Sequence, residues 1–231
     1  MSHNNSLRDE IRLQRQKMAG QPLKKKLEYY WSYYRTLVII LVLAACMLGS
    51  FLHSMLTRKE TVLSVAYINA FPNIEDSHFM EGFDQYLKLN TKRQETCLDS
   101  SFYISETSDS PYTVSNRQRF IAMAAAHSFD VVVADEYYFT RYAKEGYFQD
   151  LRFLLSAEQL ESLQDHLLYR DLPGDGTDSP VPVGINVSQA CRIVETSSYP
   201  NTTAYYGIMA DSEHTDNALS FLSYLNTSST K

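Results

Sequence analysis

Glycine, proline and cysteine are scarce in this sequence of 231 residues, which contains eight, seven and three of them. The glycines form no G-x-G-x-x-G, Walker A or G-x-S-x-G pattern, so no dinucleotide, nucleotide or serine-hydrolase site is indicated. The histidines show no H-E-x-x-H or H-x-H spacing, which argues against a metal site. From these absences we predict a protein that is not an enzyme and that carries no metal and no cofactor.

The few cysteines leave little room for a disulfide framework. No two of them have the close spacing of a metal-binding pair. Outside the apolar segment described below, only Cys97 and Cys191 remain. They form one disulfide if the compartment is oxidising, or they stay two isolated small apolar side chains, and the sequence leaves both interpretations open.

Acidic residues are scarce in the first part of the chain, and basic residues are outnumbered in the second. Residues 1–56 hold eight basic and three acidic residues, a net charge of +5. Residues 57–231 hold 13 basic and 24 acidic residues, a net charge of −11. An acidic domain repels the phosphate backbone, so nucleic acid is disfavoured as a partner of the larger part.

Charged residues are missing altogether from Leu37 to Leu56. A membrane-spanning helix needs about 20 mostly apolar residues, and this run supplies them. Eight basic residues precede the run and only Arg58 and Lys59 follow it closely, a bias that places the N-terminus inside. We therefore expect a basic cytoplasmic tail at 1–35, a single transmembrane helix at 36–56 and an extracytoplasmic domain at 57–231.

A second interpretation of the apolar run is a lipoprotein signal, because Leu43-Ala44-Ala45-Cys46 has the form of a lipobox. Against cleavage before Cys46, the run continues through Phe51 and Leu52, and the leader is longer than a usual signal n-region. An uncleaved anchor is favoured, and either interpretation tethers the outer domain to a membrane.

A collar of lysines and aromatic residues precedes the apolar run. Amphipathic rings prefer the headgroup level, and basic side chains there are attracted to anionic lipid. We expect these residues at the inner surface of the lipid bilayer: Lys24, Lys25, Lys26, Tyr29, Tyr30, Trp31, Tyr33, Tyr34 and Arg35. The collar resembles that of many membrane proteins of Gram-positive bacteria.

Strand-like and helix-like segments alternate in the outer part. Alternating or continuous β-formers predict strands at 61–70, 96–105, 129–134, 181–188 and 203–210. Helical spacing predicts helices at 76–89, 115–127, 139–145, 156–168 and 216–225. This alternation predicts an α/β fold with a largely parallel sheet flanked by helices.

Three helix ends carry their own signals. Ser115 with Gln118, and Ser156 with Gln159, form capping-box patterns at predicted helix starts. Gly146 marks the end of the short helix that begins near Phe139.

Short motifs follow one another through the outer part in a recognisable order. They are Phe129-Asp130-Val131-Val132-Val133-Ala134-Asp135, residues 139–146, Asp150-Leu151, Pro182-Val183-Gly184-Ile185, Gly207-Ile208 and Ala218-Leu219-Ser220-Phe221-Leu222. In this order they resemble the extracytoplasmic solute-binding proteins of ABC transporters. The resemblance implies one lobe of a periplasmic-binding-protein-like fold, a Gram-positive source and an ABC-type transporter or other membrane protein as a partner.

Members of that family are longer, and they clamp a ligand between two lobes. Here the 16 residues from Ser188 to Thr203 stand where most of the second lobe is expected, and they are too few to form it. We therefore expect a reduced relative with one lobe and half a cleft.

Ligands of open α/β sheets bind beyond the carboxyl ends of the strands. By that rule the candidate ligand-binding residues are Asn69, Phe71, Asp135, Glu136, Tyr137, Tyr138 and Asn186. Aromatic rings with carboxylates suit a small solute such as a sugar or a cation. The alternative is structural: the tyrosines pack on the sheet edge and Asp135 caps the next helix.

The resulting hypothesis is a membrane-anchored, non-enzymatic extracytoplasmic binding module that presents a solute- or partner-binding surface next to an ABC-type transporter. The alternative is a protein-interaction subunit of a membrane complex with a disused ligand cleft. A third possibility, an extracytoplasmic enzyme, has no supporting motif.

Overall fold

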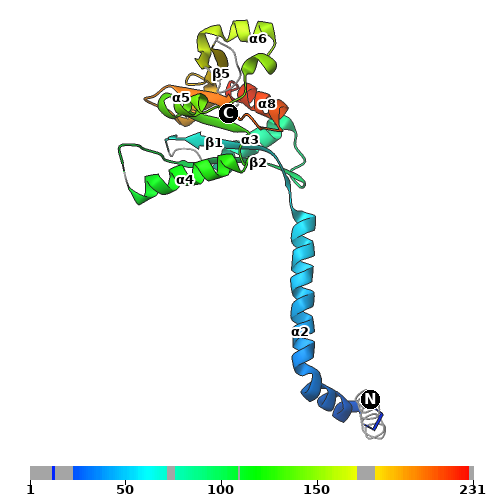
Figure 1. Ribbon diagram of the computed structural model, residues 1–231. Helices are drawn as coiled ribbons and strands as arrows, with labels where there is room; N and C mark the ends of the chain where they lie inside the picture. Colours follow the sequence, from blue (N-terminus) through cyan, green and yellow to red (C-terminus); the bar gives the residue numbers. More distant parts are fainter. Residues whose placement is uncertain (1–11, 14–22, 72–75, 109, 171–179, 229–231) are drawn as a thin grey trace, which may run out of the picture. The chain divides into compact units, whose positions relative to one another are not determined.

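The computed structural model describes residues 12–13, 23–71, 76–108, 110–170 and 180–228 (Figure 1). The chain divides into two compact units, Met1–Arg58 and Lys59–Lys231. This boundary lies within two residues of the expected start of the outer domain.

The described part of the first unit is dominated by one helix, α2 (Leu23–Thr57). Its segment Arg35–Met55 is long and apolar enough to cross a membrane, with a mean hydropathy of 2.3. The described apolar side chains of this segment are exposed, as a lipid-facing helix requires. The expected collar falls on the first three turns of α2, where Trp31 and Arg35 are exposed and the side chains of Lys24, Lys25, Lys26, Tyr29, Tyr30, Tyr33 and Tyr34 lie outside the described structure.

The second unit is built on a six-stranded sheet with strand order β2-β1-β3-β6-β5-β4. The strands are β1 (Glu60–Ile68), β2 (Gln94–Phe102), β3 (Val131–Asp135), β4 (Leu167–Arg170), β5 (Val181–Asn186) and β6 (Ala204–Ile208). β1 pairs in parallel with β2 and β3, whereas the pairs β3–β6, β6–β5 and β5–β4 are antiparallel. The sheet is therefore mixed, and the prediction of a largely parallel sheet was wrong.

The antiparallel half follows from the connection between β5 and β6. The two ends of this connection lie at the same edge of the sheet, where the Val187 amide donates to the Ala204 carbonyl at 2.9 Å. The helix within it, α7 (Cys191–Thr196), rises only about 9 Å over six residues, so the chain does not return to the opposite edge. Because β6 starts where β5 ends, it runs back antiparallel. An alternating pattern of strands and helices does not reveal strand direction.

Helices cover both faces of the sheet (Figure 1). On one face lie α3 (Asp76–Leu87), α7, α8 (Thr215–Leu225) and the 151–163 region, with η1 (Leu151–Phe153) and α6 (Ala157–Ser162). On the other face lie α4 (Pro111–Ala125) and α5 (Glu136–Lys144). Alternate residues of the central strand β3 serve the two cores, Val131 and Val133 on one side and Val132 and Ala134 on the other.

Two of the predicted helix-end signals are confirmed, and two predicted helix limits were wrong. The capping box of Ser156 and Gln159 is formed, and Gly146 follows α5 with a positive φ of 81°. The start predicted at Ser115 was wrong, because Ser110 caps α4 and Pro111 occupies its first turn. The helix predicted to Leu168 also ends early: α6 stops at Ser162, η2 (Gln164–His166) follows, and Leu167 begins β4.

Phe139 joins α5 to the antiparallel half of the sheet. Its ring stacks on Phe148, with centroids 4.3 Å apart and planes 6° from parallel. A Cβ atom at Gly184 would lie 2.5 Å from Phe139, and one at Gly207 would lie 2.7 Å from Phe148 and 2.8 Å from Phe139. Both glycines are thus sites where a ring meets the backbone directly.

Substitution of Gly207 by alanine is expected to lower the free energy of unfolding by about 1–3 kcal/mol, because the Phe139–Phe148 pair must move. Denaturant unfolding of the full chain in detergent measures this. The matched control is Gly49→Ala, since a Cβ there has no atom within 4 Å. Equal stabilities of the two variants would contradict this account of Gly207.

Candidate functional site

Two of the predicted binding residues meet at the carboxyl edge of the sheet. The Asn69 side-chain amide donates to Asp135 Oδ2 at 2.7 Å, and Asn69 Oδ1 accepts from the Ile104 amide at 2.8 Å. Asp135 Oδ1 accepts from the Tyr138 amide at 3.1 Å, which caps α5. Both carboxylate oxygens of Asp135 are therefore occupied by the protein itself.

Asn186 is also used within the fold. Its side-chain oxygen accepts from the amide and the hydroxyl of Ser188, at 3.0 and 2.8 Å. The Ser188 hydroxyl in turn accepts from the Ala204 amide at 2.8 Å. Asn186 thus shapes the turn out of β5, a local role that asparagine fills often.

The rings of Tyr137 and Tyr138 pack edge to face with centroids 5.1 Å apart, but the predicted aromatic residues differ in exposure. Tyr138 is buried on the α4–α5 side of the sheet, and burial raises the pKa of its phenol. Phe71 and Tyr137 are each more than half exposed. Of the predicted set, Asp135, Glu136 and Tyr137 line a common pocket.

The segment 188–203 covers the carboxyl ends of the central strands. The Phe71 amide donates to the Ser198 carbonyl at 2.6 Å, and the Glu136 amide donates to the Thr203 carbonyl at 3.0 Å. This segment therefore occupies the edge where a solute is expected to bind in an open α/β sheet.

Tyr199 is the residue that closes this edge. Its hydroxyl lies 2.9 Å from the carbonyl oxygens of both Ile68 and Val133, at the ends of β1 and β3. Its side chain is buried, and this burial raises the pKa of the phenol well above its usual value. Sequence reasoning missed Tyr199, although it is the one aromatic residue among the 16 from Ser188 to Thr203.

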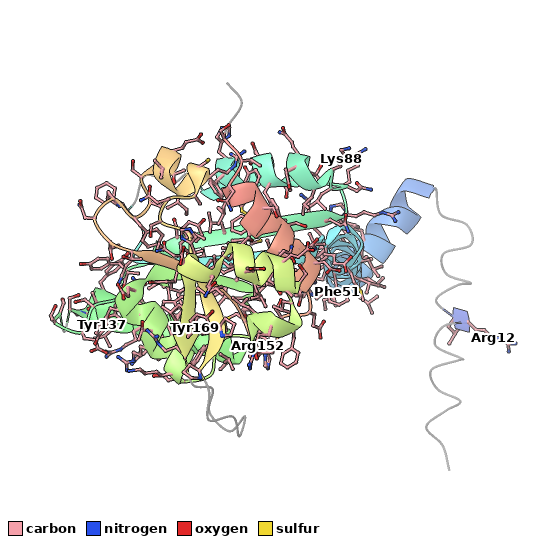
Figure 2. All side chains as sticks on the ribbon, turned by 90° about the horizontal axis from the view of Figure 1, so that it is seen from above. Arg12, Phe51, Lys88, Tyr137, Arg152 and Tyr169 are labelled. Carbon is pink, nitrogen blue, oxygen red and sulfur yellow. The ribbon has the colours of Figure 1, made fainter. Side chains whose placement is uncertain are left out.

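A pocket of about 820 Å³, here called the α5 pocket, opens beside the closed edge. Its lining comes from α5, the end of β4 and the loop before β6: Asp135, Glu136, Tyr137, Thr140, Arg141, Lys144, Glu145, Arg170 and Thr202. Tyr137 on α5 and Tyr169 on β4 lie toward one side of the domain, away from Lys88 (Figure 2). Sequence reasoning named Asp135, Glu136 and Tyr137 of this lining and missed the other six residues.

Cys97 on β2 and Cys191 at the start of α7 are both free and exposed. The disulfide considered from the sequence is therefore not formed in the structure. Burial of the thiol, together with the nearby carboxylates of Glu95 and Asp84, raises the pKa of Cys97.

Asp130 is a buried carboxylate at the opposite edge of the sheet. It accepts from the Ser64 amide at 2.8 Å and from the Ser212 hydroxyl at 2.7 Å, and His214 Nδ1 lies 3.1 Å away. A hydrolytic triad needs the serine hydroxyl to donate to the histidine. Here the hydroxyl donates to the carboxylate, so the cluster fits a structural link between β1, β3 and the start of α8.

No protein-family model and no curated protein matches this sequence. Among solved structures, a hydrogen-peroxide-bound mutant of OxyR from Corynebacterium glutamicum aligns over 97% of this chain and 86% of its own, with 13% identity and a TM-score of 0.29. At that TM-score the alignment carries no argument about fold or function. The protein has a mixed α/β sheet flanked by helices, and one helix of membrane-spanning length precedes it in the sequence.

Substitution of Tyr199 by phenylalanine is expected to cost about 1–3 kcal/mol at neutral pH, since the single hydroxyl hydrogen near the two carbonyl oxygens is lost. Because the pKa of Tyr199 is raised in the folded state, its phenol stabilises the fold below the ordinary tyrosine pKa of about 10 and destabilises it as pH rises further. The variant should therefore lose about 1.4 kcal/mol less per pH unit above pH ~10 than the wild type.

Denaturant unfolding of the full chain across alkaline pH, with tyrosinate absorbance recorded in parallel, measures both effects. Tyr103→Phe is the control, because the Tyr103 side chain is more than half exposed, and its stability at neutral pH should match the wild type. An unchanged alkaline slope in Tyr199→Phe would show that the phenol ionises within the fold.

Proposed function

We propose that this protein is a membrane-anchored extracytoplasmic interaction module, without enzymatic activity, whose folded domain binds another membrane protein. The observation that carries the proposal is the closure of the carboxyl edge by Tyr199 and the segment around it. A solute receptor needs that edge open, because pockets bury most of the surface of a small ligand. The closed edge favours a protein partner over a solute in the cleft.

Exposed aromatic rings surround the closed edge. β1, β2 and β3 are parallel, so the residues that follow them share one edge of the sheet. Three such rings, Phe71 after β1, Tyr103 after β2 and Tyr137 after β3, are each more than half exposed; together with the equally exposed Tyr112 in the first turn of α4 they are here called the aromatic rim. Aromatic residues are enriched in the cores of protein–protein interfaces, and hot spots are commonly tyrosine.

The Tyr137 ring of the rim is held by a side-chain contact, and the backbone at Tyr103 is held by another. The Tyr137 hydroxyl donates to Glu106, which also forms an ion pair with Arg141. The Asn116 side chain donates to the Tyr103 carbonyl at 3.2 Å. Rings that are fixed before binding lose less conformational entropy in a complex, so the rim suits a specific partner.

The proposal also includes anchoring of the protein in a membrane by α2. The apolar segment of α2 would cross the membrane, with the basic collar on the cytoplasmic side and the acidic domain outside. Only Arg58 and Lys59 lie between the end of α2 and the start of β1. A relationship to the solute-binding proteins of ABC transporters would make such a transporter the partner to test first.

With the acidic domain outside the cell, as proposed, a membrane-impermeant maleimide is expected to label this protein in intact Gram-positive cells. Cys97 and Cys191 provide free exposed thiols, and the raised pKa of Cys97 should make it the slower of the two. Mass spectrometry of the labelled chain gives the readout, with Cys97→Ser and Cys191→Ser together as the control. Labelling that needs permeabilised cells would place the domain in the cytoplasm.

The rim predicts the site of partner contact. A photo-crosslinking residue at position 103 or 137 of the full chain should join to a membrane protein, whereas one at position 86 should not. Tyr86 is an exposed aromatic near the end of α3 and lies outside the rim, so it is a matched control. Loss of a hot-spot tyrosine costs about 2 kcal/mol or more, so Tyr103→Ser with Tyr137→Ser should weaken partner binding by roughly 30-fold or more.

Equal crosslinking from positions 86 and 103, or full affinity in the double variant, would refute the rim as the interface.

A further inference from the structure

The α5 pocket contains basic side chains that have no acidic partner among the described residues. Arg141 forms ion pairs with Glu106 and Glu145. Lys144 and Arg170 form no ion pair in the described part of the chain, and both line the pocket. The pocket therefore offers two cationic groups whose charge the described fold does not neutralise.

Arg170 is held in place by its neighbours. One of its terminal nitrogens donates to the Tyr169 carbonyl at 2.6 Å, and the other donates to the Thr140 hydroxyl at 2.9 Å. Its Nε is buried and has no hydrogen-bond partner among the described residues. A buried donor without a partner costs free energy, and a guanidinium without a counter-ion costs more.

The free-energy cost of an unpartnered buried donor is common in binding sites, where a bound ligand supplies the missing hydrogen-bond acceptor. A guanidinium presents paired donors that match a carboxylate or a phosphate, and an ammonium adds a strong point charge. The pocket volume of about 820 Å³ lies within the range of small-molecule sites.

We propose that the α5 pocket binds a small molecule carrying one carboxylate or phosphate group, which Arg170 and Lys144 hold.

The remaining charges of the pocket restrict the ligand. Asp135 is engaged by Asn69 and by the cap of α5, and Glu145 is paired with Arg141. Glu136 forms no ion pair among the described residues and adds a negative charge to the same lining. A polyanion would be repelled by Glu136 and by the acidic domain, whereas one anionic group on a hydroxyl-bearing ligand fits both sets of partners.

This site adjoins the closed strand edge and takes a small molecule in place of a protein, so it goes beyond the proposed protein interaction. It shares Tyr137 with the aromatic rim, and a bound ligand would therefore lie next to the partner surface. Ligand binding and partner binding are measured separately, so either one fails without deciding the other.

The test is isothermal titration of the full chain in nanodiscs with glycerol phosphate, inorganic phosphate and lactate, at constant ionic strength set with chloride. Saturable binding of a phosphate compound alone identifies a phosphate site, and binding of lactate alone identifies a carboxylate site. Affinity should fall as salt rises. Absence of saturable binding by all three probes would overturn the proposal.

Variants separate the pocket from unspecific charge effects. Arg170→Gln and Lys144→Gln should each weaken binding by roughly tenfold or more, because a charge-assisted contact is lost. Arg93→Gln and Lys92→Gln are the matched controls, since both residues are exposed and lie outside the pocket. Lys144 is exposed, so its variant tests the site even if Arg170→Gln fails to fold. Unchanged affinity in Lys144→Gln, or an equal loss in the controls, would refute the assignment.

Discussion

The packing of the Phe139 ring against the backbone of Gly184 and Gly207 determines where α5 lies on the sheet. In the register of β5 and β6, Gly184 and Gly207 lie opposite one another, and the Phe139–Phe148 pair occupies the space that side chains would fill there. This contact fixes α5 on the antiparallel half of the sheet, while the capping carboxylate of Asp135 fixes its start at the end of β3. The α5 pocket and one ring of the aromatic rim both depend on that placement.

Tyr199 has the complementary role at the sheet edge. The two carbonyls that its hydroxyl approaches belong to neighbouring parallel strands, whose ends would otherwise face a cleft. A polar group buried without a partner is costly, so the Tyr199 hydroxyl stabilises the closed edge by lying within hydrogen-bond distance of these carbonyls. The same residues that complete the fold thereby cover the edge of the sheet where a solute would be expected to bind.

The distribution of charge agrees with this division. Residues 57–231 carry a net charge of −11, and Arg141 on α5 is paired with the carboxylates of Glu106 and Glu145. Against that background Arg170 and Lys144 stand out by lacking such partners among the described residues. Field effects of the whole domain repel anions, so only a local site with directed donors would hold one.

Local patterns in the sequence were enough to place the apolar helix, five of the six strands, the capping box at Ser156 and, as one of two interpretations, the cap role of Asp135. Each depends on neighbours within a few residues, which is why the sequence alone carries it. Strand direction, the early end of α6, the closing role of Tyr199 and the meeting of Arg170 with α5 were decided by tertiary structure. The contacts of Arg170 with Thr140 and of Tyr199 with Ile68 join residues that are 30 and 131 positions apart in the sequence. No local sequence pattern indicates which distant residue a side chain will contact.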